Sequence, residues 1–467
     1  MTDTGARSWA VEEFGKAEFG DARLTARLVH MAMACASSPS GRVSDVFSED
    51  AGLQGAYDFI EGGASRAGVI LRSCQEACAR RASEYPYVFV PVDGTSLSLV
   101  DRAKTKNFGP IGTRAKGGRG LKVIDSIAVS PDGVPLGLAA MQWWARGKGL
   151  LKRARSRPPK DRETQHWIDA VHDVVDVFER HAPQTKAWFQ LDREADAWRL
   201  LSELSSTGHF FTVRSSGTRR LRAPGRKYLR SYVSRRPAQG QMKVEVPARR
   251  DRPARTARMT VRFCEVVLEL RDKWTKKVRP IKVTVVYVRE SHAPRGVKAL
   301  DWLLITNRPV KTLKDAKLVI RGYTQRWRIE DFHKTWKSGV CDVESTQLRD
   351  STHVITWATL LAAVATRVER LKHLAREKPD APASEELSLA EVRALILLRR
   401  KHKRRNEEVP DTMPSIATAT TWIARLGGYT GERSGGPPGS ITIGRGLERL
   451  RAAAELIEVL GLAEKTS

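Results

Sequence analysis

The stretch YVFVPVDGTSLSLV, residues 87–100, decides the fold class, because β-branched and aromatic residues lead into an acid and turn-forming residues. This pattern predicts a strand that ends at Asp93. Residues 121–130 and 135–144, joined by the turn sequence PDG, predict two more strands. The chain therefore begins a sheet at this point, and the next segments must complete it.

A fourth strand follows one predicted helix. Residues 163–181 have helical periodicity, and the apolar run KAWFQL, residues 186–191, ends at Asp192 before another helix. Three strands, a helix and a fourth strand ending in an acid describe a ribonuclease H-like α/β sheet. Because Asp93 or Asp192 alone is more often a cap or turn residue, a catalytic interpretation needs a third acid.

The sequence YTQRWRIEDFHKTWKSG, residues 323–339, supplies that acid. On one continuous helix with about 100° per residue, four polar side chains share a stripe opposite the apolar residues. The four are Tyr323, Arg326, Glu330 and Lys337. A solvated face with a weak i,i+4 ion pair fits this geometry equally well. Joined to the two Asp residues, however, Glu330 completes the shared carboxylates that two Mg²⁺ ions require. His333 lies near the stripe and reads as incidental.

Positive charge is the strongest global signal. The 467 residues carry a formal net charge of +28, which attracts polyanions. Residues 146–160 contain seven basic residues and no acid, and residues 214–262 contain sixteen basic residues against two acids. We expect nucleic acid as the partner, bound through its phosphates. A charge that serves solubility, or a ribosome-type basic surface, is the alternative.

Within the second basic block, alternating sequences at 241–250, 257–270 and 279–290 predict short antiparallel strands separated by turns. We interpret residues 215–290 as a small basic β-module. A surface sheet with incidental arginines is the alternative.

Both ends of the chain predict helices. Asp21 can cap a helix with apolar residues at Leu24, Leu28 and Met31, within a helical unit spanning residues 9–63. Two arginines, Arg23 and Arg27, lie on one side of it. Near the end, a Gly/Pro loop separates two helices. The apolar face of the last helix can pair with another subunit or pack on its own body; its residues are Leu447, Leu450, Ile457 and Leu460.

The compartment follows from what the sequence lacks. Five cysteines in so long a chain make no disulfide framework, and the N-terminus has no signal-peptide pattern. The longest apolar run, residues 354–366, is shorter than the roughly 17 residues of a membrane span. We expect a buried helix there, no membrane partner and a cytoplasmic protein.

Several motifs together resemble the IS-four family of bacterial DDE transposases. The pattern Y-x2-R-x3-E-x6-K of residues 323–337 is similar to the family signature. Residues 9–28 resemble its end-binding domain, VDGTSLS (92–98) and LDREAD (191–196) its two Asp motifs, and LGGYTGERSGGPPG (426–439) its C-terminal segment. The resemblance covers nearly the whole chain, with the motifs in the family's order.

The resemblance implies a catalytic triad of Asp93, Asp192 and Glu330 that binds two Mg²⁺ or Mn²⁺ ions per active site. It implies a cut-and-paste transposase that nicks the transposon end and lets the 3′-hydroxyl attack the opposite strand. The resulting hairpin is reopened and the end is joined to target DNA. A two-metal site suits each of these in-line phosphoryl transfers.

Residues around the triad are implied to hold DNA. A hairpin strains the duplex, so a base must leave the stack and rest on an aromatic surface; the resemblance gives this role to Trp302 and Trp327. It also implies phosphate contacts from four residues, namely Tyr323, Arg326, Lys337 and Arg214.

The expected architecture therefore has three parts. Residues 1–68 form a helical end-DNA-binding domain. Residues 69–372 form a ribonuclease H-like α/β catalytic core with the antiparallel β insertion, and residues 373–467 form a helical dimerisation region. The expected partners are double-stranded DNA, as inverted-repeat transposon ends and target, and a second protomer in a homodimer.

Two other functions remain open. A ribonuclease H-like endonuclease that only hydrolyses, such as a junction resolvase, would need neither the end-binding helices nor the two tryptophans. A domesticated, inactive transposase would act as a DNA-binding regulator, although the complete triad argues against it.

Overall fold

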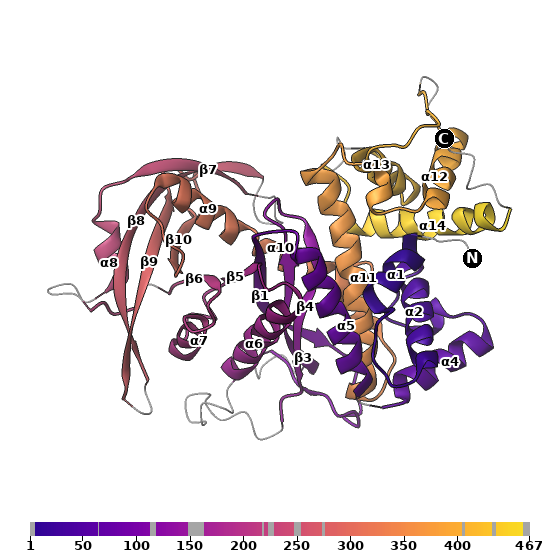
Figure 1. Ribbon diagram of the computed structural model, residues 1–467, viewed down its shortest axis with the longest axis horizontal. Coiled ribbons are helices and arrows are strands. Elements are labelled where there is room, and N and C mark those ends of the chain that lie inside the picture. Colours follow the sequence, from indigo (N-terminus) through magenta and orange to yellow (C-terminus); the bar gives the residue numbers. More distant parts are fainter. Residues whose placement is uncertain are drawn as a thin grey trace. The chain divides into compact units, whose positions relative to one another are not determined.

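The computed structural model describes residues 5–63, 65–112, 118–147, 163–216, 219–222, 228–246, 254–272, 276–403, 407–431 and 436–460 (Figure 1). The chain forms two compact units. The sheet unit contains Tyr85–Asp93 and Arg153–Trp327, and the helical unit contains Met1–Glu84, Gly94–Lys152 and Arg328–Ser467. Most of the predicted basic loop at 146–160 lies outside the described residues.

A large mixed sheet forms the sheet unit, with the strand order β1-β5-β6-β10-β9-β8-β7. β1, β5 and β6 run parallel to one another, and the later neighbours are antiparallel. The strands are β1 (Tyr87–Ser98), β5 (Lys186–Leu191), β6 (Phe210–Arg214), β7 (Gly240–Val246), β8 (Arg255–Arg271), β9 (Val278–Glu290) and β10 (Asp301–Thr306). The parallel strands carry consecutive buried residues because both of their faces are covered.

The end of β1 differs from the sequence prediction, which placed it at Asp93. The strand continues through the turn-forming residues to Ser98. Beyond Asp93 the strand belongs to the helical unit, where the Ser98 amide donates to a Glu344 carboxylate oxygen at 2.7 Å. The Leu99 amide donates to the Arg119 carbonyl at 2.9 Å. These hydrogen bonds hold an extended conformation that local propensity does not favour.

The three strands predicted in the basic β-module are confirmed as β7, β8 and β9, which pair antiparallel. They do not form a separate sheet. β9 also pairs with β10, and β10 pairs with β6, so the basic strands extend the sheet that contains Asp192's strand, β5.

Helices accompany the sheet: α6 (Thr164–His181), α7 (Trp198–Leu204), α8 (Leu229–Ser234) and α9 (Leu313–Thr324). α9 begins with a capping box in which Thr312 and Asp315 each bond the other's backbone amide. Near its end it packs closely on β1, because a Cβ on Gly322 would lie 2.6 Å from the Phe89 ring. This glycine sets how near α9 can come to the strand that carries Asp93.

The helical unit contains three antiparallel strands: β2 (Gly109–Pro110), β3 (Arg119–Val129) and β4 (Pro135–Trp144). Its N-terminal helices are α1 (Gly5–Phe14), α2 (Ala22–Ser37), α3 (Val43–Val46), α4 (Asp50–Glu61) and α5 (Ser65–Ala82). Its later helices are α10 (Trp327–Lys337), α11 (Ser351–Glu377), α12 (Leu389–Lys401), α13 (Ile416–Leu426) and α14 (Ser440–Val459), with short 3₁₀ turns at Val343–Ser345 and Ala383–Glu385. α10 takes its first residue, Trp327, from the sheet unit.

The predicted N-terminal cap is confirmed. Asp21 accepts the Arg23 amide at 2.9 Å and starts α2, whose residues Leu28 and Met31 are buried. The short helix α3 follows α2 within the same N-terminal helical segment.

The buried helix predicted at residues 354–366 is confirmed as part of the long helix α11. Its Trp357 indole donates to the Gly41 carbonyl at 2.9 Å. None of the helices within the described residues has the length and hydropathy to span a bilayer.

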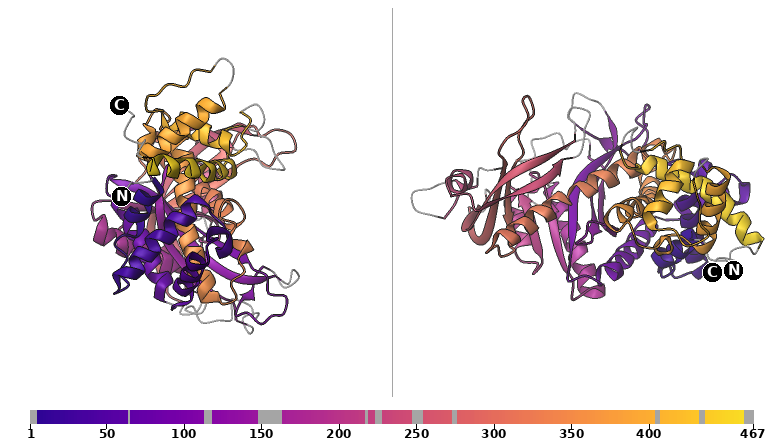
Figure 2. Two further views of the ribbon diagram at one scale, coloured as in Figure 1. Left: turned by 90° about the vertical axis from the view of Figure 1, so that its right-hand side faces the viewer. Right: turned by 90° about the horizontal axis from the view of Figure 1, so that it is seen from above.

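The last helix packs on its own chain. α14 contacts α12 and α13 (Figures 1 and 2), and Leu447, Leu450 and Ile457 of the predicted apolar face are buried in a shared core. Leu460 remains 66% exposed. Of the two alternatives for this face, the intramolecular one accounts for most of it.

The signature stretch 323–339 is not one helix. α9 ends at Thr324 and α10 begins at Trp327, with Gln325 and Arg326 in a tight turn between them. The Arg326 amide bonds the Tyr323 carbonyl at 3.1 Å, an i,i+3 bond that tightens the helix end. The predicted single stripe is therefore wrong as geometry: Tyr323 lies before the break, Arg326 lies within it, and Glu330 lies after it.

Candidate active site

Two acids lie at equivalent positions of neighbouring parallel strands. Val92 of β1 pairs with Leu191 of β5, and each is followed directly by an aspartate, Asp93 or Asp192. Strands in a sheet are about 4.8 Å apart, so the two carboxylates are attached to neighbouring strands at the same level of the sheet. Such a pair can share a divalent metal ion.

A basic residue follows on the next strand. Leu191 pairs with Val213 of β6, so Arg214 is the neighbour of Asp192 in the same register. Arg214 donates to the Asp301 carbonyl oxygen at 3.1 Å. One edge of the parallel strands therefore presents two acids and an arginine side by side.

Arg326 pairs directly with the first acid. Its guanidinium Nη1 lies 3.0 Å from Asp93 Oδ2, and the two side chains are 11% and 19% exposed. A half-buried carboxylate needs a compensating cation. Arg326 supplies it here, and the same oxygen atoms have the chemistry of a Mg²⁺ or Mn²⁺ ligand.

Tyr323 lies beside the same groups, in the last turn of α9. Burial raises the pKa of Tyr323, and the charge of Asp192 adds to this, while Arg326 and Arg214 lower it. Tyr323 is thus a neutral phenol that is held between acids and arginines, and it is not on an exposed stripe.

Trp302 meets both Tyr323 and Trp327 edge to face. The Trp302 ring centroid on β10 lies 5.3 Å from that of Tyr323 and 6.0 Å from that of Trp327. Trp302 is 3% exposed, whereas Trp327 is half-buried. The accessible ring is therefore Trp327, and Trp302 supports it from within the fold.

Glu330 and Lys337 come from the other unit. Glu330 is half-buried in the first turn of α10. Lys337 Nζ lies 3.2 Å from Thr95 Oγ1 and 3.6 Å from a Glu344 carboxylate oxygen. Within the helical unit, the last turn of α10 therefore contacts the final part of β1, at Thr95.

The structure thus brings together seven of the predicted site residues in the sheet unit: Asp93, Asp192, Arg214, Trp302, Tyr323, Arg326 and Trp327. The two predicted N-terminal contacts lie elsewhere, on α2. Arg23 has a 93% exposed side chain beside Asp21, and the Arg27 guanidinium lies against Gly55 of α4.

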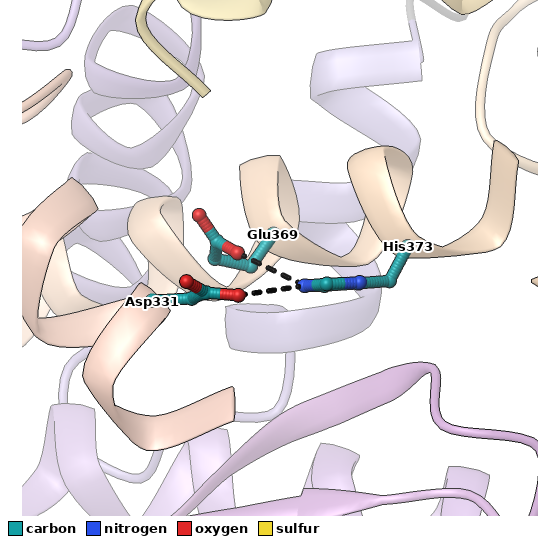
Figure 3. A group of neighbouring side chains, drawn as sticks. All are labelled: Asp331, Glu369 and His373. Carbon is teal, nitrogen blue, oxygen red and sulfur yellow. Dashed lines mark ion pairs between the residues drawn. The ribbon is translucent and has the colours of Figure 1, made fainter. Parts of the chain in front are cut away.

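Sequence reasoning missed a buried group next to Glu330. Asp331, Glu369 and His373 place ligand-type atoms within 4.8 Å of one another (Figure 3). Figure 3 shows His373 pointing at both acids, and its Nε2 lies 3.4 Å from each. The i,i+4 spacing of Glu369 and His373 on α11 was the available signal.

A lysine already balances that group. Lys372 Nζ contacts Glu369 closely and lies 3.6 Å from Asp331. Thr335 and Ser440 also donate to Glu369. Burial raises the pKa of Glu369, but Lys372 and His373 outweigh it, so the net pKa lies well below its ordinary value. The group is a polar network that joins α10, α11 and α14, and the Lys372 ammonium supplies its positive charge.

His333 was wrongly taken as incidental. Its Nε2 lies 2.7 Å from Oδ1 of Asp125, a fully buried residue of β3. The alternation of β3 alone did not show that an acid of this strand would meet α10.

Comparison with protein families agrees with this geometry. Residues 6–63 match the family described as transposase DNA-binding, and residues 148–367 match the transposase DDE domain. The first match covers α1 to α4. The second contains Asp192 and Glu330, and Asp93 precedes it. Together, the two matches support a DNA transposase of the DDE class.

Proposed function

We propose that the chain is a cut-and-paste transposase of the IS-four family. One observation carries the proposal: Asp93 and Asp192 follow a paired register position on parallel strands, with Arg326 on Asp93. Glu330, in the first turn of α10, supplies the third acid. Asp93, Asp192 and Glu330 then form the catalytic set of a ribonuclease H-like core.

The three carboxylates fit two Mg²⁺ or Mn²⁺ ions, because hard divalent cations prefer oxygen ligands. Such ions activate the attacking oxygen and stabilise the leaving oxygen of an in-line displacement. Arg326 balances the charge of Asp93, and its guanidinium would be able to hold a DNA phosphate if a divalent ion took over that role. Arg214 and Lys337 add positive charge for the same backbone.

The aromatic cluster suits a hairpin step. Trp327 offers a half-buried ring on which an unstacked base can rest, and Trp302 packs edge to face against that ring and against Tyr323. One site would perform nicking, hairpin formation, hairpin opening and joining in turn. Stacking of the base on Trp327 is needed only while the strand is bent into the hairpin.

We expect Trp302→Ala to slow hairpin formation about tenfold or more while first-strand nicking changes little. Loss of the supporting ring frees Trp327, and base–aromatic stacking is worth about 1–3 kcal/mol. Nick and hairpin products of an end-labelled duplex, resolved on denaturing gels over time, give both rates. Equal slowing of both steps would show that Trp302 acts only in the core.

The other parts take roles around this core. We propose residues 1–68 as the end-DNA-binding domain, with Arg23 and Arg27 on its DNA side, and the strands of 215–290 as a basic clamp. Residues 373–467 contribute the contact of a homodimer that bridges two inverted-repeat ends. The setting is the bacterial cytoplasm, on the nucleoid.

Purified protein incubated with labelled DNA that carries the repeats flanking its gene tests this function. With Mg²⁺ we expect nicked, hairpin and strand-transfer products. Nicking alone would indicate a ribonuclease H-like endonuclease. Binding without cleavage would indicate an inactive transposase derivative that serves as a regulator.

A further inference from the structure

Helix α10 is anchored on several sides. Arg328 Nε donates to the Gly133 carbonyl at 3.0 Å, and Thr335 donates to Glu369. The Trp336 indole donates to the Ala358 carbonyl at 2.9 Å. These contacts join α10 to α11 and to the turn that follows β3, and they fix its ends more than its middle.

Two anchors lie near the middle of α10: Asp331, through Lys372 and His373 of α11, and an acid–histidine pair that joins the helix to β3. His333 lies three residues after Glu330, and residues spaced by three lie on the same side of a helix. Its Nε2 meets Asp125 Oδ1 at 2.7 Å, with side chains that are 13% and 0% exposed. The other Asp125 oxygen, Oδ2, has no hydrogen-bond partner among the described residues.

This buried pair contributes less to stability than an apolar contact of the same size would. Burying a carboxylate with one unsatisfied oxygen costs free energy that an apolar pair of similar size would avoid. The pair does, however, contribute a directional contact. A short hydrogen bond between β3 and α10 fixes the rotation of the helix about its own axis. Apolar packing tolerates small rotations better.

Rotation matters because Glu330 is on the same side. A side-chain tip lies about 5 Å from the helix axis, so a turn of about 10° moves it by roughly 1 Å. A displacement of about 1 Å can cost about 10²-fold in rate. The position of the Glu330 carboxylate therefore depends on how firmly the rotation of α10 is fixed.

We propose that Asp125 and His333 are positioning residues for Glu330, which set the rotation of α10 and thereby the metal affinity of the third carboxylate. The inference rests on the proposed function. Neither residue ligates metal or touches DNA in this scheme, and both act through Glu330.

The test uses full-length protein bound to end DNA and measures two quantities. Mn²⁺ binding is followed by the loss of the free-ion EPR signal, and nicking is measured against Mn²⁺ concentration. His333→Leu removes the hydrogen bond and keeps bulk, whereas His333→Gln retains a donor. Lys334→Arg, on the exposed side of the same helix, is the matched control.

We expect His333→Leu to raise the half-saturating Mn²⁺ concentration in both measurements by about 10-fold or more, the usual effect of losing an outer partner of a metal site. End-DNA affinity stays within about twofold, and His333→Gln recovers most of the metal affinity. Asp125→Asn, nearly isosteric, weakens Mn²⁺ binding as well. The double variant Asp125→Asn/His333→Leu is no worse than His333→Leu, because the pair acts as a unit.

Unchanged Mn²⁺ binding in His333→Leu would overturn the inference, as would a loss of folding stability with a normal metal response. If the wild type itself neither bound Mn²⁺ nor nicked DNA, the proposed function would fail as well. A wild type that nicks, beside a His333→Leu variant that titrates identically, removes only this inference.

Discussion

Asp192→Asn is expected to bind end DNA with wild-type affinity and to nick it at least about 10²–10³-fold more slowly. Asn keeps the shape of the side chain and removes the charge that the divalent ions need. Loss of one preorganised charge-stabilising group typically costs about this factor. Glu330→Gln should behave in the same way, because it removes the third carboxylate.

Single-turnover nicking of a labelled end, with gel-shift titration of the same DNA, measures both effects. Glu194→Gln is the matched control, since Glu194 is exposed two residues further on and only its backbone amide bonds Asp192, at 2.7 Å. We expect it to nick like the wild type. Full nicking by either acid variant would remove that acid from the catalytic set, and parallel loss of DNA binding would point to a structural role.

The second large effect concerns stability. Glu369→Gln should lower the free energy of unfolding of the helical unit by about 3 kcal/mol, because breaking a buried ion pair leaves an uncompensated buried charge. Lys372 and His373 would keep only Asp331 as an acidic partner in this network. Urea unfolding at neutral pH, followed by circular dichroism, measures the change.

Glu455→Gln is its control, because Glu455 pairs with Arg451 at 2.6 Å on the surface of α14 and surface pairs contribute about 0–1 kcal/mol. The pH dependence gives a further check. Since the folded-state pKa of Glu369 lies below its unfolded value of 4.5, its contribution is present at neutral pH and declines as the pH falls below about 4.5. The stability of Glu369→Gln should therefore decline less on acidification. An effect as small as that of Glu455→Gln would show that the network contributes little.

Local patterns predicted the strands well and the ends of elements poorly. Apolar and alternating runs identified β1, β5 and the three strands β7, β8 and β9, because strand formation depends on side-chain types that can be read directly from the sequence. The stop at Asp93 was wrong because the amides of Ser98 and Leu99 donate hydrogen bonds to Glu344 and Arg119, which extend β1. Those partners are remote in sequence.

In the stretch 323–339 the local pattern failed in the opposite way, because it missed a break, whereas β1 had been predicted to end too early. Its spacing matched one continuous helix, and no proline or glycine between Tyr323 and Glu330 marked a break. The tight turn at Gln325 and Arg326 places Arg326 on Asp93 and Tyr323 against Trp302. Side-chain contacts decided the break, and helix propensity did not.

The sequence by itself determined which chemistry is present: two acids after apolar strands, a third in an aromatic and basic helix, and a net charge of +28 that favours DNA. Only the tertiary structure decided how these residues meet. The parallel pairing of β1 with β5, the buried Asp125–His333 contact and the Lys372 network depend on long-range packing and on the satisfaction of buried charges. Those terms act between segments far apart in the chain, which is why local pattern and propensity do not contain them.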